Sequence, residues 1–394
     1  MKRWLYAILD TALMGVGFGP LSMMGVAKPD LMAHFNVSDD IYGLQHVSYV
    51  FGLFIAFLLG ETKIYEGGFK RGVGIALSFA AIPQVLIPFM PCWYLVVFLR
   101  FVQGLAISMI PLFTAQIAGL FISERPLAKG IILSGLFWGG LLGSFSGEYL
   151  VRALGWRGAF YTTGLAMYGM LALWWILTQD FRVARRKEGV KDNVWGMRFT
   201  WVLGLTFFPA LWVIFTLVGL APSLGYELGW SKGQVAAMSM ALNLSMAFWS
   251  IMIGLVAYLL SRGKTKARDL FIALVKAMIL SYVISFLGLI VYSRAMINGD
   301  YTLAIISTMM IGALQGTGPA FWSSAPAAYP KEIFPRASFA IGLISNSANA
   351  IAPMITEFIV TINKVVAMIE LTAMPLLGIT FLVLLLKMRL PVEK

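Results

Sequence analysis

The sequence predicts an all-α membrane protein in which twelve transmembrane helices form two pseudo-symmetric six-helix bundles. Three observations carry this prediction: the composition, the spacing of the apolar segments and the distribution of the basic residues. Of the 394 residues, 59% are hydrophobic and only 12% are charged, which is about half the charged share of a soluble domain. The mean hydropathy is +0.83. This composition excludes a soluble enzyme and a disordered protein.

Twelve apolar segments are separated by charged or Gly- and Pro-containing gaps. A helix needs about 20 apolar residues to cross the hydrocarbon core of a bilayer, and the segments have this length. They cover residues 5–27, 41–60, 72–90, 93–116, 129–151, 158–178, 200–221, 234–260, 269–293, 301–325, 337–360 and 365–386. The longest gap is polar and basic, and it predicts a cytoplasmic linker at 180–199 between an N-terminal bundle at 1–179 and a C-terminal bundle at 200–394.

The basic residues fall unevenly on alternate gaps. Of the 30 Lys and Arg residues, 22 lie at the two termini and in one set of gaps, counting Lys129 at the edge of its segment with the gap before it. Six lie in the other set, and Arg100 and Lys276 lie inside segments. Because cytoplasmic gaps collect Lys and Arg, we expect an integral cell-membrane protein with both termini in the cytoplasm. The same asymmetry explains the net charge of +12 without a nucleic-acid partner.

The two halves of the chain carry the same landmarks. Gln103-Gly104 lies in the fourth segment and Gln315-Gly316 lies in the tenth, and a turn with acidic, basic and proline residues follows each pair. Transporters use such repeats so that two similar bundles can rock about a central site. The repeat therefore predicts a duplicated transporter architecture.

Four stretches, taken together, resemble the major facilitator superfamily over the whole chain. Residues 100–104 (RFVQG) resemble its R-x-x-Q-G motif, and residues 155–160 (GWRGAF) resemble its GWR-x-x-F signature. Residues 332–336 (EIFPR) resemble its E-x-F-P signature, and the pattern of residues 29–43 is also similar to the family's. The resemblance implies the fold of this superfamily and a secondary transporter that works by alternating access.

Polar residues inside the apolar segments are the candidate substrate site. An ionisable side chain in lipid costs about 2.5–3.5 kcal/mol and usually faces a cavity or a partner. Arg100 and Gln103 share one face of the fourth segment, since they are three residues apart. The guanidinium can bind an anionic substrate, act on a coupling acid, or pair between helices as a structural group.

Two further faces carry polar or aromatic side chains. Gln315 and Trp322 lie on one face of the tenth segment, and Asn346 and Asn349 lie on one face of the eleventh. Amides in lipid need partners, so these side chains either bind substrate or join helices. Residues 318–322 (GPAFW) also resemble the G-P-x-x-W sequence of sugar porters.

Two titratable residues are candidates for proton coupling. Asp10 lies inside the first segment, where it can carry a proton or bond to loop amides and to Lys2 or Arg3. His46 lies in the second segment and can titrate near neutral pH, or it can be an interfacial residue. A ladder of glycines in the fifth segment, Gly135, Gly139, Gly143 and Gly147, predicts a close-packing seam.

The expected function is secondary transport of a small organic anion with proton symport. A sugar or a drug is the alternative substrate, and a non-transporting sensor or a membrane-embedded transferase is the alternative class. The sequence contains no G-x-S-x-G, H-E-x-x-H, C-x-x-C or Walker motif, so we expect no enzyme activity and no cofactor. One Cys and two His leave little for a metal site. The expected partners are a small solute, protons and the bilayer, and the expected state is a monomer.

Overall fold

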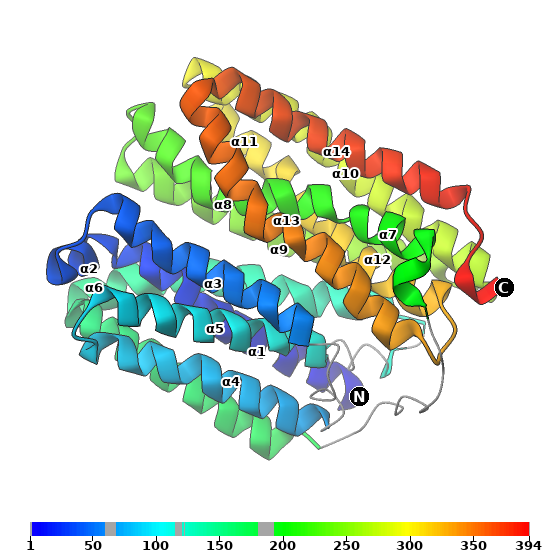
Figure 1. Cartoon of the computed structure of the whole chain (residues 1–394), viewed down its shortest axis with the longest axis horizontal. Coiled ribbons are helices and arrows are strands. Elements are labelled where there is room, and N and C mark those ends of the chain that lie inside the picture. The colour runs from blue at the N-terminus through cyan, green and yellow to red at the C-terminus, as the bar shows by residue number, and fades with distance from the viewer. Residues whose placement is uncertain (1, 60–67, 115–119, 122, 180–192, 394) are drawn as a thin grey trace. The chain divides into compact units, whose positions relative to one another are not determined.

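A computed structural model describes residues 2–59, 68–114, 120–121, 123–179 and 193–393. This part of the chain is helical and contains no β-strand (Figure 1). The helices are α1 (Lys2–Val26), α2 (Lys28–Phe35), α3 (Asp39–Leu59), α4 (Phe69–Leu86), α5 (Trp93–Thr114), α6 (Arg125–Leu177), α7 (Arg198–Leu205), α8 (Phe208–Glu227), α9 (Lys232–Ser261), α10 (Ala267–Asn298), α11 (Tyr301–Ile311), α12 (Ala313–Ala328), α13 (Phe334–Ile362) and α14 (Lys364–Leu386).

The apolar helices agree with the predicted segments. Within the described ranges, nine helical stretches are long and apolar enough to cross a membrane, and two shorter apolar stretches cover Ile41–Ala56 and Trp93–Met109. Each predicted segment overlaps one of these stretches, and the segments at 129–151 and 158–178 both fall in α6. The all-α membrane fold is therefore confirmed, and the number of twelve spans stays a prediction.

Two local breaks have clear chemical causes. In α6 the backbone is non-helical at Gly155, where φ is +68°, a conformation that glycine adopts without a steric penalty. The predicted segment at 200–221 is two helices, α7 and α8, and Pro209 lies in the first turn of the second one. Proline has no amide hydrogen, so it fits the first turn of a helix better than its interior.

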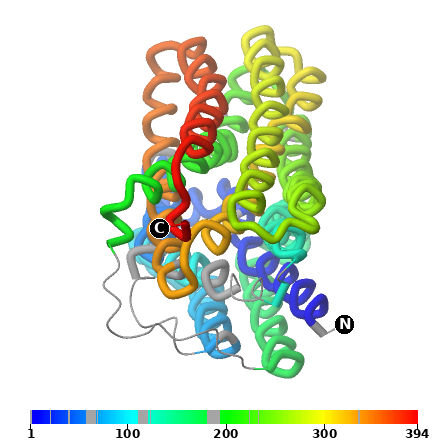
Figure 2. The backbone as a smooth tube through the Cα atoms, turned by 90° about the vertical axis from the view of Figure 1, so that its right-hand side faces the viewer, coloured from blue at the N-terminus to red at the C-terminus, as the bar shows by residue number. Residues whose placement is uncertain are grey.

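The chain forms two compact units. Unit 1 contains Met1–Phe121 and Gly135–Arg185, and unit 2 contains Ile122–Ser134 and Arg186–Lys394. In unit 1, α3 and α4 pack along α5 (Figure 1). In unit 2, α10 packs against α9, α11, α12 and α14, and α13 packs against α7, α8 and α14 (Figure 2).

The beginning of α6 belongs to unit 2, although the sequence placed it in the N-terminal bundle. The reason is a close helix contact: a Cβ atom on Gly130 would lie 2.4 Å from the carbonyl oxygen of Ser250 in α9. The Ser250 hydroxyl also donates a hydrogen bond of 3.0 Å to the Gly130 carbonyl. The predicted bundle boundaries at residues 179 and 200 stay a prediction.

A glycine seam joins α1 to α6 in unit 1. A Cβ atom on Gly139 would lie 2.1 Å from the carbonyl oxygen of Gly15, and one on Gly143 would lie 2.5 Å from that of Gly19. A Cβ atom on Gly135 would likewise lie 2.3 Å from the carbonyl oxygen of Thr11 in α1. No side chain fits at these three positions of α6, so the predicted close-packing seam is confirmed for them.

The repeated Gln-Gly pairs have similar surroundings in the two units. A Cβ atom on Gly104 of α5 would lie 2.0 Å from the carbonyl oxygen of Tyr49 in α3. A Cβ atom on Gly316 of α12 would lie 2.5 Å from the Cγ1 atom of Ile253 and 3.0 Å from the carbonyl oxygen of Trp249, both in α9. Each glycine thus lets the backbone of its helix approach a neighbouring helix, as expected if the two halves share an ancestral arrangement.

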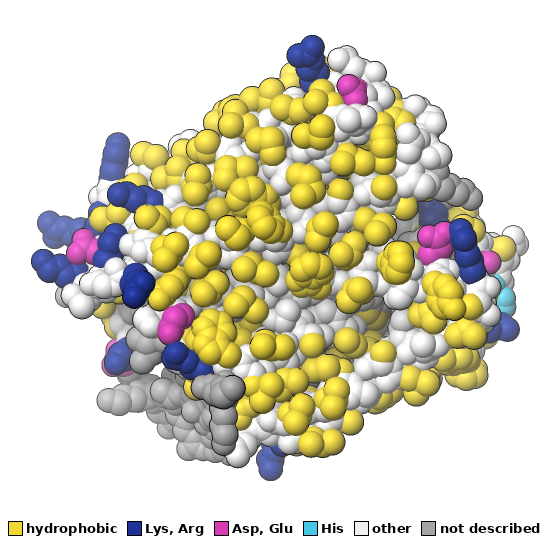
Figure 3. Space-filling model, turned by 180° about the vertical axis from the view of Figure 1, so that it is seen from behind, with side chains coloured by type: hydrophobic (Ala, Val, Ile, Leu, Met, Phe, Trp, Pro, Cys, Tyr) yellow, Lys and Arg dark blue, Asp and Glu magenta, His cyan; other side chains and the backbone are white. Residues whose placement is uncertain are grey.

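Large apolar side chains lie on the outside of the helices. Phe98, Phe145 and Phe358 are each more than half exposed. Figure 3 shows hydrophobic side chains spread over the visible face, with most basic side chains near its margins. Such a surface is suited to lipid rather than to water.

Candidate functional site

A buried polar network surrounds Arg100 in unit 1. Arg100 and Gln103 project from α5 and have no exposed surface. The Arg100 Nε atom donates a hydrogen bond of 3.0 Å to the Gln45 Oε1 atom of α3, and its Nη1 atom donates to the Gln103 Oε1 atom. The Arg100 Cζ atom lies 4.4 Å from the centre of the Tyr49 ring, a cation–π contact.

The network extends to two more helices. The Gln103 Nε2 atom donates to the Gln84 Oε1 atom of α4 at 3.2 Å and to the Ala80 carbonyl at 3.1 Å. The Gln84 Nε2 atom in turn donates to the Thr163 hydroxyl of α6 at 2.8 Å. Neutral amides and hydroxyls therefore hold the guanidinium in place across α3, α4, α5 and α6.

The charge of Arg100 has no counter-charge in the described residues. Its partners there are neutral, and no carboxylate among them pairs with it. Its Nη2 atom and the Tyr49 hydroxyl also have no hydrogen-bond partner in that part of the chain. A buried guanidinium with a free donor is a suitable partner for an anion.

Asp10 is a buried carboxyl group in α1. It has no exposed surface, and neither of its oxygens has a hydrogen-bond partner among the described residues. No loop amide and no Arg3 side chain donates a hydrogen bond to Asp10 among these residues, and the side chain of Lys2, the other predicted partner, lies outside the described part of the chain. His46, the other candidate for proton coupling, is half-buried on α3 next to Gln45.

The candidates of unit 2 lie on α12 and α13. Gln315 and Asn349 are buried, whereas Trp322 and Asn346 are half-buried. The Asn349 Nδ2 atom donates to the Asn346 Oδ1 atom at 2.9 Å, and the Asn346 Nδ2 atom donates to the Gly342 carbonyl at 2.9 Å. The Asn349 Oδ1 atom accepts no hydrogen bond from a described residue, so it remains available to a ligand.

A family model described as "Major Facilitator Superfamily" matches residues 12–353 of the chain. The chain belongs to the major facilitator superfamily. The fold agrees with this membership: the solved structure of the proton:xylose symporter XylE, bound to 6-bromo-6-deoxy-D-glucose, matches with a TM-score of 0.76 at 14% sequence identity. The match covers 98% of this chain and 95% of that one. A secondary transporter of this superfamily, as the sequence motifs implied, is therefore confirmed.

A curated protein that is similar in sequence is the "Gallate transporter" of Pseudomonas putida. It is 22% identical over 370 residues, which cover 84% of this chain and 79% of the relative. The superfamily and its fold are those of integral membrane transporters, so the coarse function of this chain is transport of a small molecule.

The sequence did not identify the residues that surround Arg100. Gln45, Gln84 and Tyr49 were not predicted, although the first two are, like Gln103, amides inside apolar segments. Tyr49 lies four residues after Gln45 and therefore on the same helix face. Lys129 was grouped with a basic cytoplasmic gap, but it is buried and its ammonium donates to the carbonyl of Trp322.

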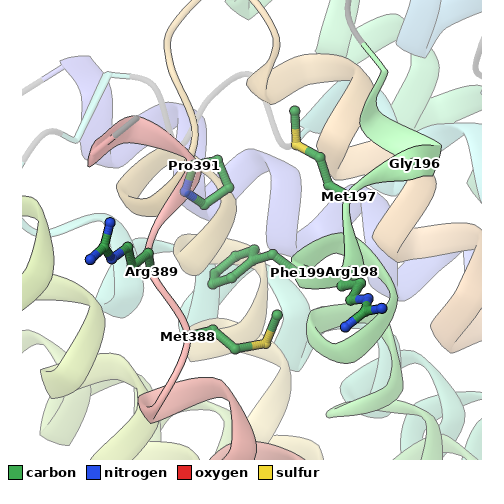
Figure 4. Close-up of a pocket in the computed structure, with 7 residues that line it drawn as sticks. All are labelled: Gly196, Met197, Arg198, Phe199, Met388, Arg389 and Pro391. Atoms are coloured by element: carbon green, nitrogen blue, oxygen red, sulfur yellow. The ribbon is translucent and has the colours of Figure 1, made fainter.

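A separate cavity lies at the C-terminal end of unit 2. Its volume is about 540 Å³, and its lining comes from residues 196–199 and from Met388, Arg389 and Pro391. In Figure 4 the ring of Phe199 and the side chain of Met388, both part of the lining, lie between Arg198 and Arg389, whose guanidinium groups point away from each other. None of the predicted substrate residues lines this cavity, so we assign it no part in substrate binding.

Proposed function

We propose that this transporter carries a small organic anion together with protons, by alternating access. The observation that carries the proposal is the buried guanidinium of Arg100, which has a free Nη2 atom and no carboxylate partner among the described residues. Burying an uncompensated charge costs several kcal/mol, and an anion bound beside it offsets that cost. We also propose Gln103, Gln315, Trp322, Asn346 and Asn349 as substrate contacts.

Asp10 is the proposed proton carrier, with His46 as the second candidate. An ionised carboxylate without a hydrogen-bond partner is expensive in a dry interior, and Asp10 has no such partner among the described residues. A neutral carboxyl group costs less there. Release of the proton therefore requires a conformation in which Asp10 meets water or a partner, and this requirement can link proton movement to transport.

The relative from Pseudomonas putida supports the substrate class, because gallate is a carboxylate at neutral pH and the relative is named as its transporter. A sugar is the second candidate. The amides on α12 and α13 can bind hydroxyl groups, and the fold is shared with a xylose symporter. We further propose that the protein works as a monomer in the cell membrane, with both termini in the cytoplasm.

The test is uptake by purified protein in proteoliposomes. We expect an inward proton gradient to drive accumulation of gallate or a related aromatic carboxylate, and we expect no such accumulation of methyl gallate, which lacks the charge, or of xylose. Gradient-driven uptake of xylose without any carboxylate uptake would refute the anion proposal and favour the sugar.

Asp10→Asn tests the proton carrier in the same vesicles. This variant should lose accumulation driven by a proton gradient, because it cannot release a proton, but it should keep counterflow exchange of the anion. A variant that still accumulates the anion under the gradient would exclude Asp10, and His46→Gln would then be the next variant to measure.

A further inference from the structure

A second buried cation lies in unit 2, at the beginning of α6. Lys129 is 8% exposed, and its ammonium donates a hydrogen bond to the backbone carbonyl of Trp322 in α12. Lys129 and Trp322 both belong to unit 2. A buried lysine is rare unless it is paired. The burial of Lys129 must therefore be explained by the groups that surround its ammonium.

The carbonyl of Trp322 is available because of a proline. In an α-helix the carbonyl of a residue accepts from the amide four residues later, and the residue four positions after Trp322 is Pro326, inside α12. Proline has no amide hydrogen, so this carbonyl has no donor from the next turn. The ammonium of Lys129 occupies the vacant position.

The bond to this carbonyl does not neutralise the lysine. A carbonyl oxygen carries only a partial negative charge, and no carboxylate among the described residues pairs with Lys129. Among the described residues, a charged group near it is Arg125, one helical turn earlier in α6, which has the same sign. An ammonium has three donors, and the carbonyl uses one of them. Two donors and most of the charge therefore remain for another acceptor.

Lys129 is anchored at a candidate substrate residue of α12. The carbonyl that its ammonium contacts belongs to Trp322, which follows Gln315 by seven residues, about two helical turns. We propose that Lys129 is a specificity-determining residue that binds the carboxylate of the transported anion while it stays anchored on the Trp322 carbonyl. This inference rests on the proposed function, since it assigns a second cation to the same class of substrate.

The experiment compares two ligands that differ by one charge. Dissociation constants of gallate and of methyl gallate are measured by calorimetry on the purified full-length protein and on Lys129→Met and Lys129→Arg. A charge-assisted contact corresponds to about a tenfold or larger change in affinity. Lys129→Met should lower the affinity for gallate by that factor and leave the affinity for methyl gallate unchanged. Lys129→Arg should retain most of the preference for gallate over its methyl ester.

A second variant separates binding from folding. Pro326→Ala restores the amide donor to the Trp322 carbonyl, so the double variant Lys129→Met/Pro326→Ala keeps that carbonyl satisfied and remains measurable even if Lys129→Met alone does not fold. If Lys129 only holds the helices together, the double variant will prefer gallate over its methyl ester as strongly as Pro326→Ala does. That result would overturn the inference.

Measurements on the wild-type protein distinguish failure of the proposed function from failure of the role proposed for Lys129. If it binds gallate, benzoate and other aromatic carboxylates no better than their methyl esters, the proposed function fails and the role of Lys129 fails with it. If it prefers the carboxylates and the Lys129→Met variants keep that preference, only the role of Lys129 is overturned, and the anion proposal still stands on Arg100.

Discussion

Replacing Arg100 with methionine should separate protein stability from transport. The side chain of methionine is apolar and of similar reach, so the substitution removes the charge and leaves only a small cavity. The Gln45 and Gln103 Oε1 atoms lose their donor, and an unsatisfied buried acceptor costs about 1–3 kcal/mol. The two losses together come to roughly 2–6 kcal/mol.

The same substitution removes an unfavourable contribution. Arg100 is fully buried, and the desolvation of such a charge costs several kcal/mol. The two effects have opposite signs and similar size, so we expect the stability of Arg100→Met to stay within about 2 kcal/mol of the wild type. Arg100→Lys keeps the buried charge but cannot reproduce the planar donor fork, so it should be the less stable of the two variants.

Transport should behave differently from stability. A lost hydrogen bond between a charged donor and the substrate costs about 1.5–3 kcal/mol, which corresponds to roughly a 10- to 150-fold fall in carboxylate uptake per folded protein. The assay is initial uptake of gallate in proteoliposomes, with thermal unfolding of the same preparations. Lys276→Ala is the matched control, because Lys276 is a basic residue in an apolar helix but is exposed. Uptake at the wild-type level in Arg100→Met would refute the idea that this guanidinium meets the anion.

Three further predictions concern the fold. Gly139→Ala should lower the thermal stability sharply, since its Cβ atom would lie 2.1 Å from a backbone oxygen of α1, whereas Gly25→Ala, with nothing within 4 Å, should be neutral or stabilising. Equal melting temperatures for the two variants would argue against the seam. Gly155→Ala should cost about 1–3 kcal/mol, because alanine is strained at a φ of +68°, and a chemical-denaturation midpoint equal to the wild type's would contradict this. A reporter inserted at Gly229 should be accessible from outside the cell, and one fused after Lys394 should not; the reverse pattern would invalidate the predicted topology.

The sequence predicted the architecture because the bilayer imposes strong constraints on composition. A spanning helix must be apolar over a fixed length, and loop charges follow the side of the membrane, so both patterns are visible without any knowledge of packing. The glycines of the fifth segment could also be predicted, because their spacing of four residues places them on one helix face.

The partners of the site residues could not be predicted in the same way. The hydrogen bond between Arg100 and Gln45 forms because a particular face of α3 packs against α5. The spacing of residues within each helix does not determine which faces of two helices pack together. Lys129 illustrates a second limit. A basic residue at the edge of an apolar segment fits the rule for cytoplasmic loops, and only the contact between α6 and a proline-containing turn of α12 shows that it is buried.

The seam between α1 and α6 has a consequence for the synthesis of the protein. Gly139 lies 124 residues after its contact Gly15, so at roughly 5–20 residues per second the ribosome needs about 6–25 s to deliver the partner of α1. During that interval α1, with its buried Asp10, has no α6 to pack against. The first helix must therefore wait in the translocon, in the lipid or beside a chaperone. A neutral Asp10 side chain lowers the free-energy cost of holding α1 in an apolar environment during this interval. The residue proposed to carry protons in the mature transporter would then also ease the insertion of its own helix.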